Sequence, residues 1–148
     1  MRDCAERLRA YFTTRRPGPV VAAFLFGSQA TGRAVPGSDV DVAVVLDPTT
    51  RGVDSFSLRV DLSSELVGVL HTNEVDVLVL DEAPPLLAAR VLREGVCVYC
   101  RDEEALREFT RDRLVRAADL LPFLRRYERK LLRALGTSAA RPPAEGAI

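Results

Sequence analysis

The 148-residue sequence lacks the long apolar run of a membrane protein and the leader of a secreted one. No stretch approaches the roughly 20 consecutive apolar residues that a membrane-spanning helix needs. The N-terminal segment MRDCAERLRAYF carries a charge every few positions and has no apolar centre of the kind found in secretory signals. We therefore expect a cytoplasmic protein that makes no membrane contact.

The chain also carries no formal net charge. The chain has 21 basic and 21 acidic side chains, which gives a formal net charge of zero. A molecule without an overall field is not drawn as a whole to polyanions, so any polyanion must be bound by a local site. We do not expect nucleic acid as a direct ligand. At this length, a hydrophobic content of 47% predicts one domain with an ordinary core.

Cysteines are few, and their number is odd. Three cysteines without a secretory context argue against a disulfide framework. Cys97 and Cys100 form a CxxC, which taken alone suggests a redox pair or half of a zinc site. They lie within VCVYC, a β-branched and aromatic run that is typical of a strand. We therefore interpret both cysteines as packing residues.

Apolar periodicity predicts a sheet covered by helices. Continuous apolar runs predict buried strands at residues 19–26, 40–46 and 75–80. Helical patterns alternate with them, at residues 2–16, 54–70 and 84–94. Asp54 is the expected N-cap of the second helix, and Gly95 is expected to end the third. This alternation predicts an α/β or α+β domain over residues 1–100.

The rest of the chain has a different pattern. Residues 101–135 are helical in spacing and predict a C-terminal extension of the domain, a helix or a helix pair that Pro122 kinks or divides. Its arginines are interleaved with leucines and aromatic residues. Such a surface fits a docking site for a partner, or equally a solvated face over a hydrophobic stripe. We expect residues 136–148 to be a disordered tail.

A candidate phosphate site follows the first apolar run. Gly27 and Ser28 end this run and begin a turn that leads into a short helical segment. Glycine lets the backbone approach a phosphate, serine adds a hydroxyl donor, and a helix N-terminus presents free N–H groups. Arg33 lies close behind and is placed to reach a phosphate, although an exposed loop arginine is an equally good interpretation.

Three aspartates form the candidate catalytic centre. Asp39 and Asp41 flank one residue at the start of the second run, and side chains two apart in a strand project from the same face. Asp76 holds the equivalent place in the third run. If the strands are neighbours, all three carboxylates converge and suit two Mg²⁺ ions that support nucleotidyl transfer. The alternative is that Gly-Ser and Ser-Asp simply form turns, but their joint order favours the site.

In these motifs the sequence resembles the minimal nucleotidyltransferase (MNT) group of the DNA polymerase beta-like superfamily. The match consists of Gly27-Ser28, Gly32, Ser38-Asp39-Val40-Asp41 and, in a later strand, Asp76. The resemblance implies the polymerase beta-like fold, with a mixed sheet and packed helices. It also implies ATP as the substrate and Mg²⁺ as the cofactor, and it places Ser38 beside Gly27 and Ser28 among the nucleotide-binding residues.

The resemblance further implies a partner. MNT proteins are typically antitoxins that transfer AMP to a tyrosine of a HEPN ribonuclease toxin, so a HEPN-domain protein is the expected acceptor. Two alternatives stay open. The chain would act either as a non-catalytic antitoxin that masks the toxin, or as a small-molecule nucleotidyltransferase whose acceptor pocket is completed in a homo- or hetero-oligomer.

Overall fold

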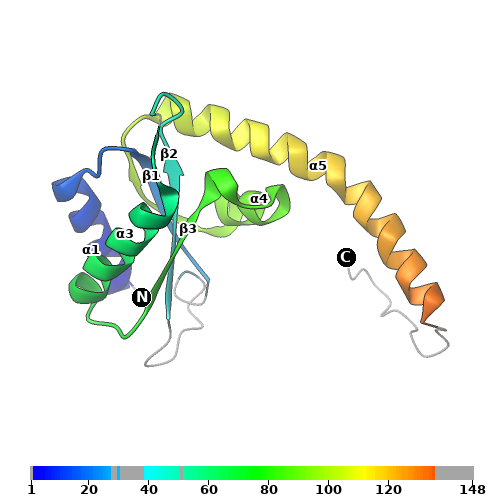
Figure 1. Ribbon diagram of the computed structural model, residues 1–148, viewed down its shortest axis with the longest axis horizontal. Helices are drawn as coiled ribbons and strands as arrows, with labels where there is room; N and C mark the ends of the chain where they lie inside the picture. The colour runs from blue at the N-terminus through cyan, green and yellow to red at the C-terminus, as the bar shows by residue number, and fades with distance from the viewer. Residues whose placement is uncertain (1, 28–29, 31–38, 51, 136–148) are drawn as a thin grey trace.

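The computed structural model describes residues 2–27, 30, 39–50 and 52–135 of the chain. Helices cover both faces of one sheet (Figure 1). A short 3-10 turn, Leu80–Glu82, follows the third strand. The other elements, in chain order, are α1 (Arg2–Arg15), β1 (Val20–Phe26), β2 (Val40–Leu46), α3 (Ser55–Leu70), β3 (Val75–Val79), α4 (Pro85–Glu94), β4 (Val96–Cys100) and α5 (Glu103–Ala134).

The sheet is mixed, as the fold class predicted. Its strands lie in the order β3-β2-β1-β4. Strand β1 pairs antiparallel with both β2 and β4, whereas β2 and β3 run parallel. The parallel pair is connected through α3, which packs against β3. This topology places β1 and β2 in the centre and leaves β3 at an edge of the described sheet.

Two hydrophobic cores lie on opposite faces of the sheet. On one face, Phe12 of α1 and Leu66 of α3 are fully buried against the strands. On the other face, Val91 of α4 packs against the strands, and Phe109 of α5 covers part of this second core. Strands β1 and β2 are therefore covered twice, which explains why their sequences are continuous apolar runs rather than alternating ones.

Helix ends coincide with the predicted capping residues. Asp54 is the N-cap of α3, and its carboxylate accepts hydrogen bonds from the backbone N–H groups of Phe56 and Ser57. Pro84 precedes α4, and Gly95 is its C-cap. The polar cap and the helix breakers thus fixed these boundaries as expected from the sequence.

The VCVYC run forms β4, as predicted. All three cysteines are free, and burial is the main cause that raises the pKa of each thiol, whereas a redox pair needs a lowered one. Within the described ranges, neither Cys97 nor Cys100 belongs to a group of three potential metal ligands. The packing interpretation is right for Cys100, which contacts the second core, and wrong for Cys97, which is exposed as a residue although its thiol is partly covered.

Helix α5 is one continuous helix, so of the two alternatives left open by the sequence, a helix or a helix pair, the single helix is the right one. Pro122 lies inside it, and Figure 1 shows the helix bending in its second half. A proline removes one backbone N–H from the ladder, which a long helix can absorb as a bend. No helix in the described part of the chain combines the length and the apolar character needed to span a membrane.

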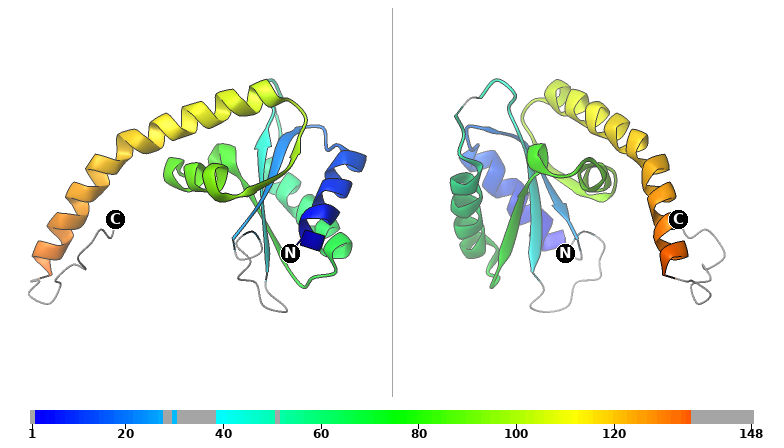
Figure 2. Two further views of the ribbon diagram at one scale, coloured as in Figure 1. Left: turned by 180° about the vertical axis from the view of Figure 1, so that it is seen from behind. Right: turned by 45° about the vertical axis from the view of Figure 1, so that its right-hand side comes forward.

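The two halves of α5 differ in their surroundings. The first half packs against α4 up to Ala117, which is buried. The second half continues past the body of the domain, and no other element among the described residues covers it (Figure 2). Most of the exposed large hydrophobic side chains among the described residues belong to this helix: Val115, Leu120, Leu121, Phe123, Leu124, Tyr127, Leu131 and Leu135, the last being its C-cap.

Candidate active site

The sheet register places the acidic residues on one face. Asp41 of β2 lies beside Asp76 of β3 in the parallel pair and beside Phe26 of β1 in the antiparallel pair. Cross-strand neighbours project from the same face, and so do residues two apart in a strand. Asp39 and Glu74, two positions before Asp41 and Asp76, therefore share that face.

This face is open where the acidic residues stand. Two positions after Asp41, Ala43 is fully buried in the core that α4 covers. Asp39, at the start of β2, is exposed, and so is Asp76. Helix α4 therefore covers only part of the length of the strands. The carboxylates lie beyond the covered part, where a ligand can approach from solvent.

Three carboxylates lie within reach of a single cation. One oxygen each from Asp39, Glu74 and Asp76 falls within a group whose members all lie within 4.8 Å of one another. The structure thus brings together two of the predicted metal ligands, with Asp41 beside them. Sequence reasoning missed Glu74, although its place two residues before Asp76 repeats the spacing of Asp39 and Asp41 and was the available signal.

The proximity of these groups raises the pKa values of two of them. Burial raises the pKa of the Asp41 carboxyl, and the negative charges of Asp76 and Asp39 raise it further. The charges of Asp39 and Asp76 likewise raise the pKa of Glu74. Like charges at this spacing repel one another, and a divalent cation relieves the repulsion. Hard oxygen donors on one open face fit Mg²⁺, which prefers carboxylates and keeps room for substrate oxygens.

Gly27 forms the turn that brings β1 next to the acidic residues. Its φ angle of +79° lies in the left-handed region, and a Cβ at this position would overlap the Oδ2 atom of Asp41. The turn closes where the N–H of Ala30 donates to the Gly27 carbonyl at 3.1 Å. The predicted nucleotide-binding residues Ser28, Arg33 and Ser38 lie outside the described residues.

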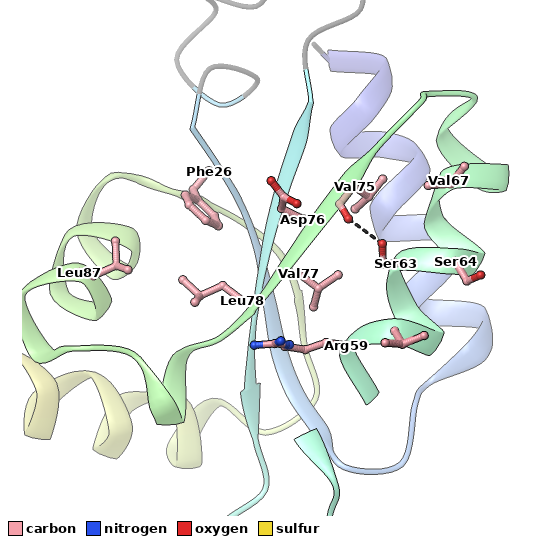
Figure 3. Close-up of a pocket in the computed structure, with 11 residues that line it drawn as sticks. Phe26, Arg59, Ser63, Ser64, Val67, Val75, Asp76, Val77, Leu78 and Leu87 are labelled. Atoms are coloured by element: carbon pink, nitrogen blue, oxygen red, sulfur yellow. Dashed lines mark hydrogen bonds between the residues drawn. The ribbon is translucent and has the colours of Figure 1, made fainter. Parts of the chain in front are cut away.

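A groove of about 830 Å³ runs along the edge strand β3 and has Asp76 in its lining (Figure 3). The side chains of α3 form one wall, and residues of β1, β3 and α4 form the other. Ser63 fixes α3 against the strand, because its hydroxyl donates to the Val75 carbonyl at 2.6 Å. The groove is lined by Phe26, Arg59, Val60, Ser63, Ser64, Val67, Val75, Asp76, Val77, Leu78 and Leu87.

The fold and the carboxylate cluster together define a nucleotidyltransferase domain. The chain belongs to the polymerase beta nucleotidyltransferase family, whose model matches residues 6–104. That span contains the whole sheet, most of α1, all of α3 and every residue of the carboxylate cluster. Among curated proteins no match was found.

Several solved structures have a similar fold. The chain is similar to one in a toxin–antitoxin complex with AMP-PNP, at 20% identity with a TM-score of 0.57, covering 93% of this chain and 98% of that one. A chain of the MntA–HepT toxin–antitoxin complex is similar at 18% identity and a TM-score of 0.58, covering 91% and 98%. A chain from the complex of a tri-AMPylated Shewanella oneidensis HEPN toxin with its MNT antitoxin is similar at 19% identity and a TM-score of 0.60, again covering 91% and 98%. At these identities the likeness establishes the fold.

Proposed function

We propose that this chain is a minimal nucleotidyltransferase that transfers AMP from ATP to a tyrosine hydroxyl of a HEPN toxin and thereby acts as its antitoxin. The observation that carries the proposal is the cluster of Asp39, Glu74 and Asp76 with Asp41 beside it, next to the glycine turn after β1. The like charges of the cluster repel one another, a bound cation relieves this repulsion, and nucleotidyl transfer is the chemistry that such a site serves in this family.

The proposed roles follow the sequence motifs. Asp39, Asp41 and Asp76 are the catalytic residues and hold the metal. Gly27, Ser28, Ser38 and Arg33 bind the triphosphate of ATP. Two Mg²⁺ ions, when bound, supply charge neutralisation of the triphosphate and acidify the acceptor hydroxyl.

The transfer itself forms one bond and breaks one. The acceptor oxygen attacks the α-phosphorus, the bond from that phosphorus to the bridging oxygen breaks, and pyrophosphate leaves. Asp76, on the edge strand, is placed to orient the acceptor hydroxyl and to take its proton. The reaction consumes ATP, which fits a cytoplasmic location.

A protein acceptor is favoured by the uncovered part of α5. Its exposed leucines and aromatic residues, among them Phe123, Tyr127 and Leu131, offer the kind of apolar anchors that protein interfaces use. This favours the partner interpretation over the solvated face. One of the similar structures is a complex of a tri-AMPylated HEPN toxin with an MNT antitoxin, which supports a HEPN toxin as the partner to propose.

The test is transfer of label from α-labelled ATP to a HEPN toxin in the presence of Mg²⁺. Label on the toxin is expected with the wild-type chain and with Asp61→Ala, an exposed acidic residue of α3 outside the cluster. No label is expected with the Asp39→Ala, Asp41→Ala double variant. If the toxin is never labelled, yet is bound and inhibited equally by all three proteins, the chain is a masking antitoxin and the catalytic proposal is wrong.

A further inference from the structure

The backbone of β3 has an outward-facing side that the described sheet does not use. The N–H of Val40 donates to the Glu74 carbonyl at 3.3 Å, so the backbone groups of Glu74 and Asp76 face β2. Alternate residues of a strand direct their backbone groups to opposite sides. Those of Val75 and Val77 therefore point away from β2. The Val75 carbonyl already accepts the Ser63 hydroxyl, which leaves the Val75 N–H and both backbone groups of Val77 on the outward side of the strand, and both residues line the groove.

Exposed apolar side chains stand on both sides of this edge. Apart from those associated with α5, the exposed large hydrophobic residues in the described ranges are Phe56, Val60 and Leu87. Val60 of α3 and Leu87 of α4 both line the groove. Phe56 lies one helical turn before Val60 and so on the same face of α3. The edge of β3 is thus flanked by apolar side chains from the helices of both faces.

The groove is continuous with the candidate active site. Asp76 lines it and also belongs to the carboxylate cluster. Figure 3 shows Asp76 on β3 between the α3 side chains Ser63 and Ser64 and, on the other side, Phe26 and Leu87. A segment that lies in the groove along β3 is therefore next to Asp76, the group that we propose to orient the acceptor hydroxyl.

We propose that the edge of β3 is the docking site for an extended segment of the acceptor protein, which pairs with Val77 and presents its hydroxyl at Asp76. An added strand receives hydrogen bonds from the exposed edge and sends alternate side chains to the two faces. The groove meets both requirements, because the backbone groups of Val77 face it and it has an apolar wall on each face. The inference rests on the proposed function, since it names how the protein acceptor of that reaction is held.

The lining of the groove fits a peptide better than a nucleic acid. Arg59 is the only cationic residue among those that line it, within the described part of the chain. Asp76 lies in the same groove, with Glu74 in the adjoining cluster, and these carboxylates repel a phosphate backbone. Val60, Val67 and Leu87 instead offer contacts to apolar side chains. Recognition through the backbone also makes the site tolerant of the acceptor's sequence beyond the reactive residue.

The first test compares Val77→Pro with Val77→Ala. Proline removes the outward N–H without touching the ladder to β2, a substitution that edge strands tolerate, while alanine keeps the N–H and matches the loss of the side chain. We expect kcat/KM for labelling of a HEPN toxin to fall about tenfold more in Val77→Pro than in Val77→Ala, with KM for ATP unchanged. Equal rates in the two variants would overturn the docking proposal.

A second test does not depend on the folding of the proline variant. Exchange of the Val77 amide hydrogen in the wild-type chain should slow at least about tenfold when the HEPN toxin is bound, since its N–H becomes paired. Protection by AMP-PNP alone would assign the groove to the nucleotide, and no protection by toxin would leave the edge unused; either result overturns the proposal. If the wild-type chain labels no toxin at all, it is the proposed function that has failed, and the docking site falls with it.

Discussion

Gly27 leaves the space that the carboxylate of Asp41 occupies. The residue adopts a φ of +79°, and any side chain there would collide with Oδ2 of Asp41. The glycine of the turn and the half-buried aspartate of the next strand are therefore one structural unit. The residue that begins the proposed phosphate-binding turn thus also determines where the carboxylate of Asp41 can lie.

Gly27→Ala should abolish activity while leaving the protein folded. The left-handed conformation costs about 1 kcal/mol for a residue with a Cβ, and the displaced Asp41 should lower the rate of AMP transfer at least about 100-fold. Gly52→Ala is the matched control, because Gly52 has a φ of +72° with no atom within 4 Å of an added Cβ. Thermal melts should show similar losses for both variants, and labelling should fail only for the first. Equal activity of the two would refute the coupling of Gly27 to Asp41.

Glu74 should contribute to the cation site although it is absent from the sequence motif. Its carboxylate lies within 4.8 Å of those of Asp39 and Asp76. We expect Glu74→Gln to raise the Mg²⁺ concentration for half-maximal transfer about tenfold, with a smaller change in the rate at saturation. Glu94→Gln, in a surface pair with Arg90, serves as the control. A magnesium titration of activity that is unchanged by Glu74→Gln would remove Glu74 from the site.

The stability of the metal-free protein should depend on pH in the direction set by the raised pKa of Asp41. Its folded-state pKa is raised, first by burial and then by Asp76 and Asp39. Such a group stabilises the fold below its unfolded pKa of about 4 and loses that contribution as pH rises through the folded value. In EDTA, Asp41→Asn should therefore gain stability relative to wild type between pH 4 and pH 7.

The control variant for this titration should show the opposite dependence of stability on pH. Hydrogen bonds from Ser57 and Phe56 lower the pKa of Asp54, so its contribution is present above the unfolded pKa and is lost as pH falls. Asp54→Asn should thus lose stability relative to wild type as pH rises. Thermal melts of the two variants across the same pH range should diverge in opposite directions, and parallel curves would contradict the assignment.

Asp81 should tolerate asparagine but not alanine. Its Oδ1 accepts the backbone N–H of Leu46 at 2.9 Å, and burial raises the pKa of the carboxyl. Asparagine keeps the acceptor and removes the buried charge, so urea denaturation at pH 7 should show equal or greater stability. Alanine leaves the Leu46 N–H without its partner and should cost about 1–2 kcal/mol. A larger loss for asparagine than for alanine would show that the negative charge itself is stabilising.

The uncovered face of α5 should carry binding of the toxin. Leu131 is 47% exposed, so Leu131→Gln should leave the melting temperature unchanged and weaken toxin binding about tenfold. Arg133→Gln changes the opposite side of the helix, about 200° away, and should have little effect. Isothermal titration with the toxin distinguishes the two. Equal binding by both variants would show that this face of α5 is a solvated surface and not the binding site of the toxin.

Much of this architecture could be predicted from the sequence because strong local signals mark it. The buried strands are continuous apolar runs, and Asp54 and Gly95 have few alternatives to capping. Glu74 was missed because it precedes its strand. Its spacing from Asp76 was the signal in the sequence, and the hydrogen bond from the Val40 N–H to the Glu74 carbonyl shows that the ladder extends to it. The division of the chain near residue 100 stays a prediction, and the expected tail at 136–148 lies outside the described residues.

Local sequence left open whether Pro122 kinks or divides the helical region. The structure has one bent helix, because the turns on either side are strong helix formers and continue through the proline. One prediction failed for a reason that lies outside local sequence. Cys97 was expected to pack inside, yet β4 is an edge strand and exposes part of its length. Edge positions depend on which strands pair, and apolar periodicity does not report that.

The parallel pairing of β2 with β3 places the candidate active site and the start of the crossover that connects these strands at opposite ends of the sheet. Asp41 and Asp76 are neighbours through the ladder, so the backbone sets their spacing. The chain leaves β2 at the far end of the sheet and crosses to α3 around Gly52, where an added Cβ would meet no atom within 4 Å. Lengthening that crossover costs only loop entropy, which grows slowly with length. The domain can therefore acquire inserted modules at this point, and with them new specificity, while its reactive centre keeps its dimensions.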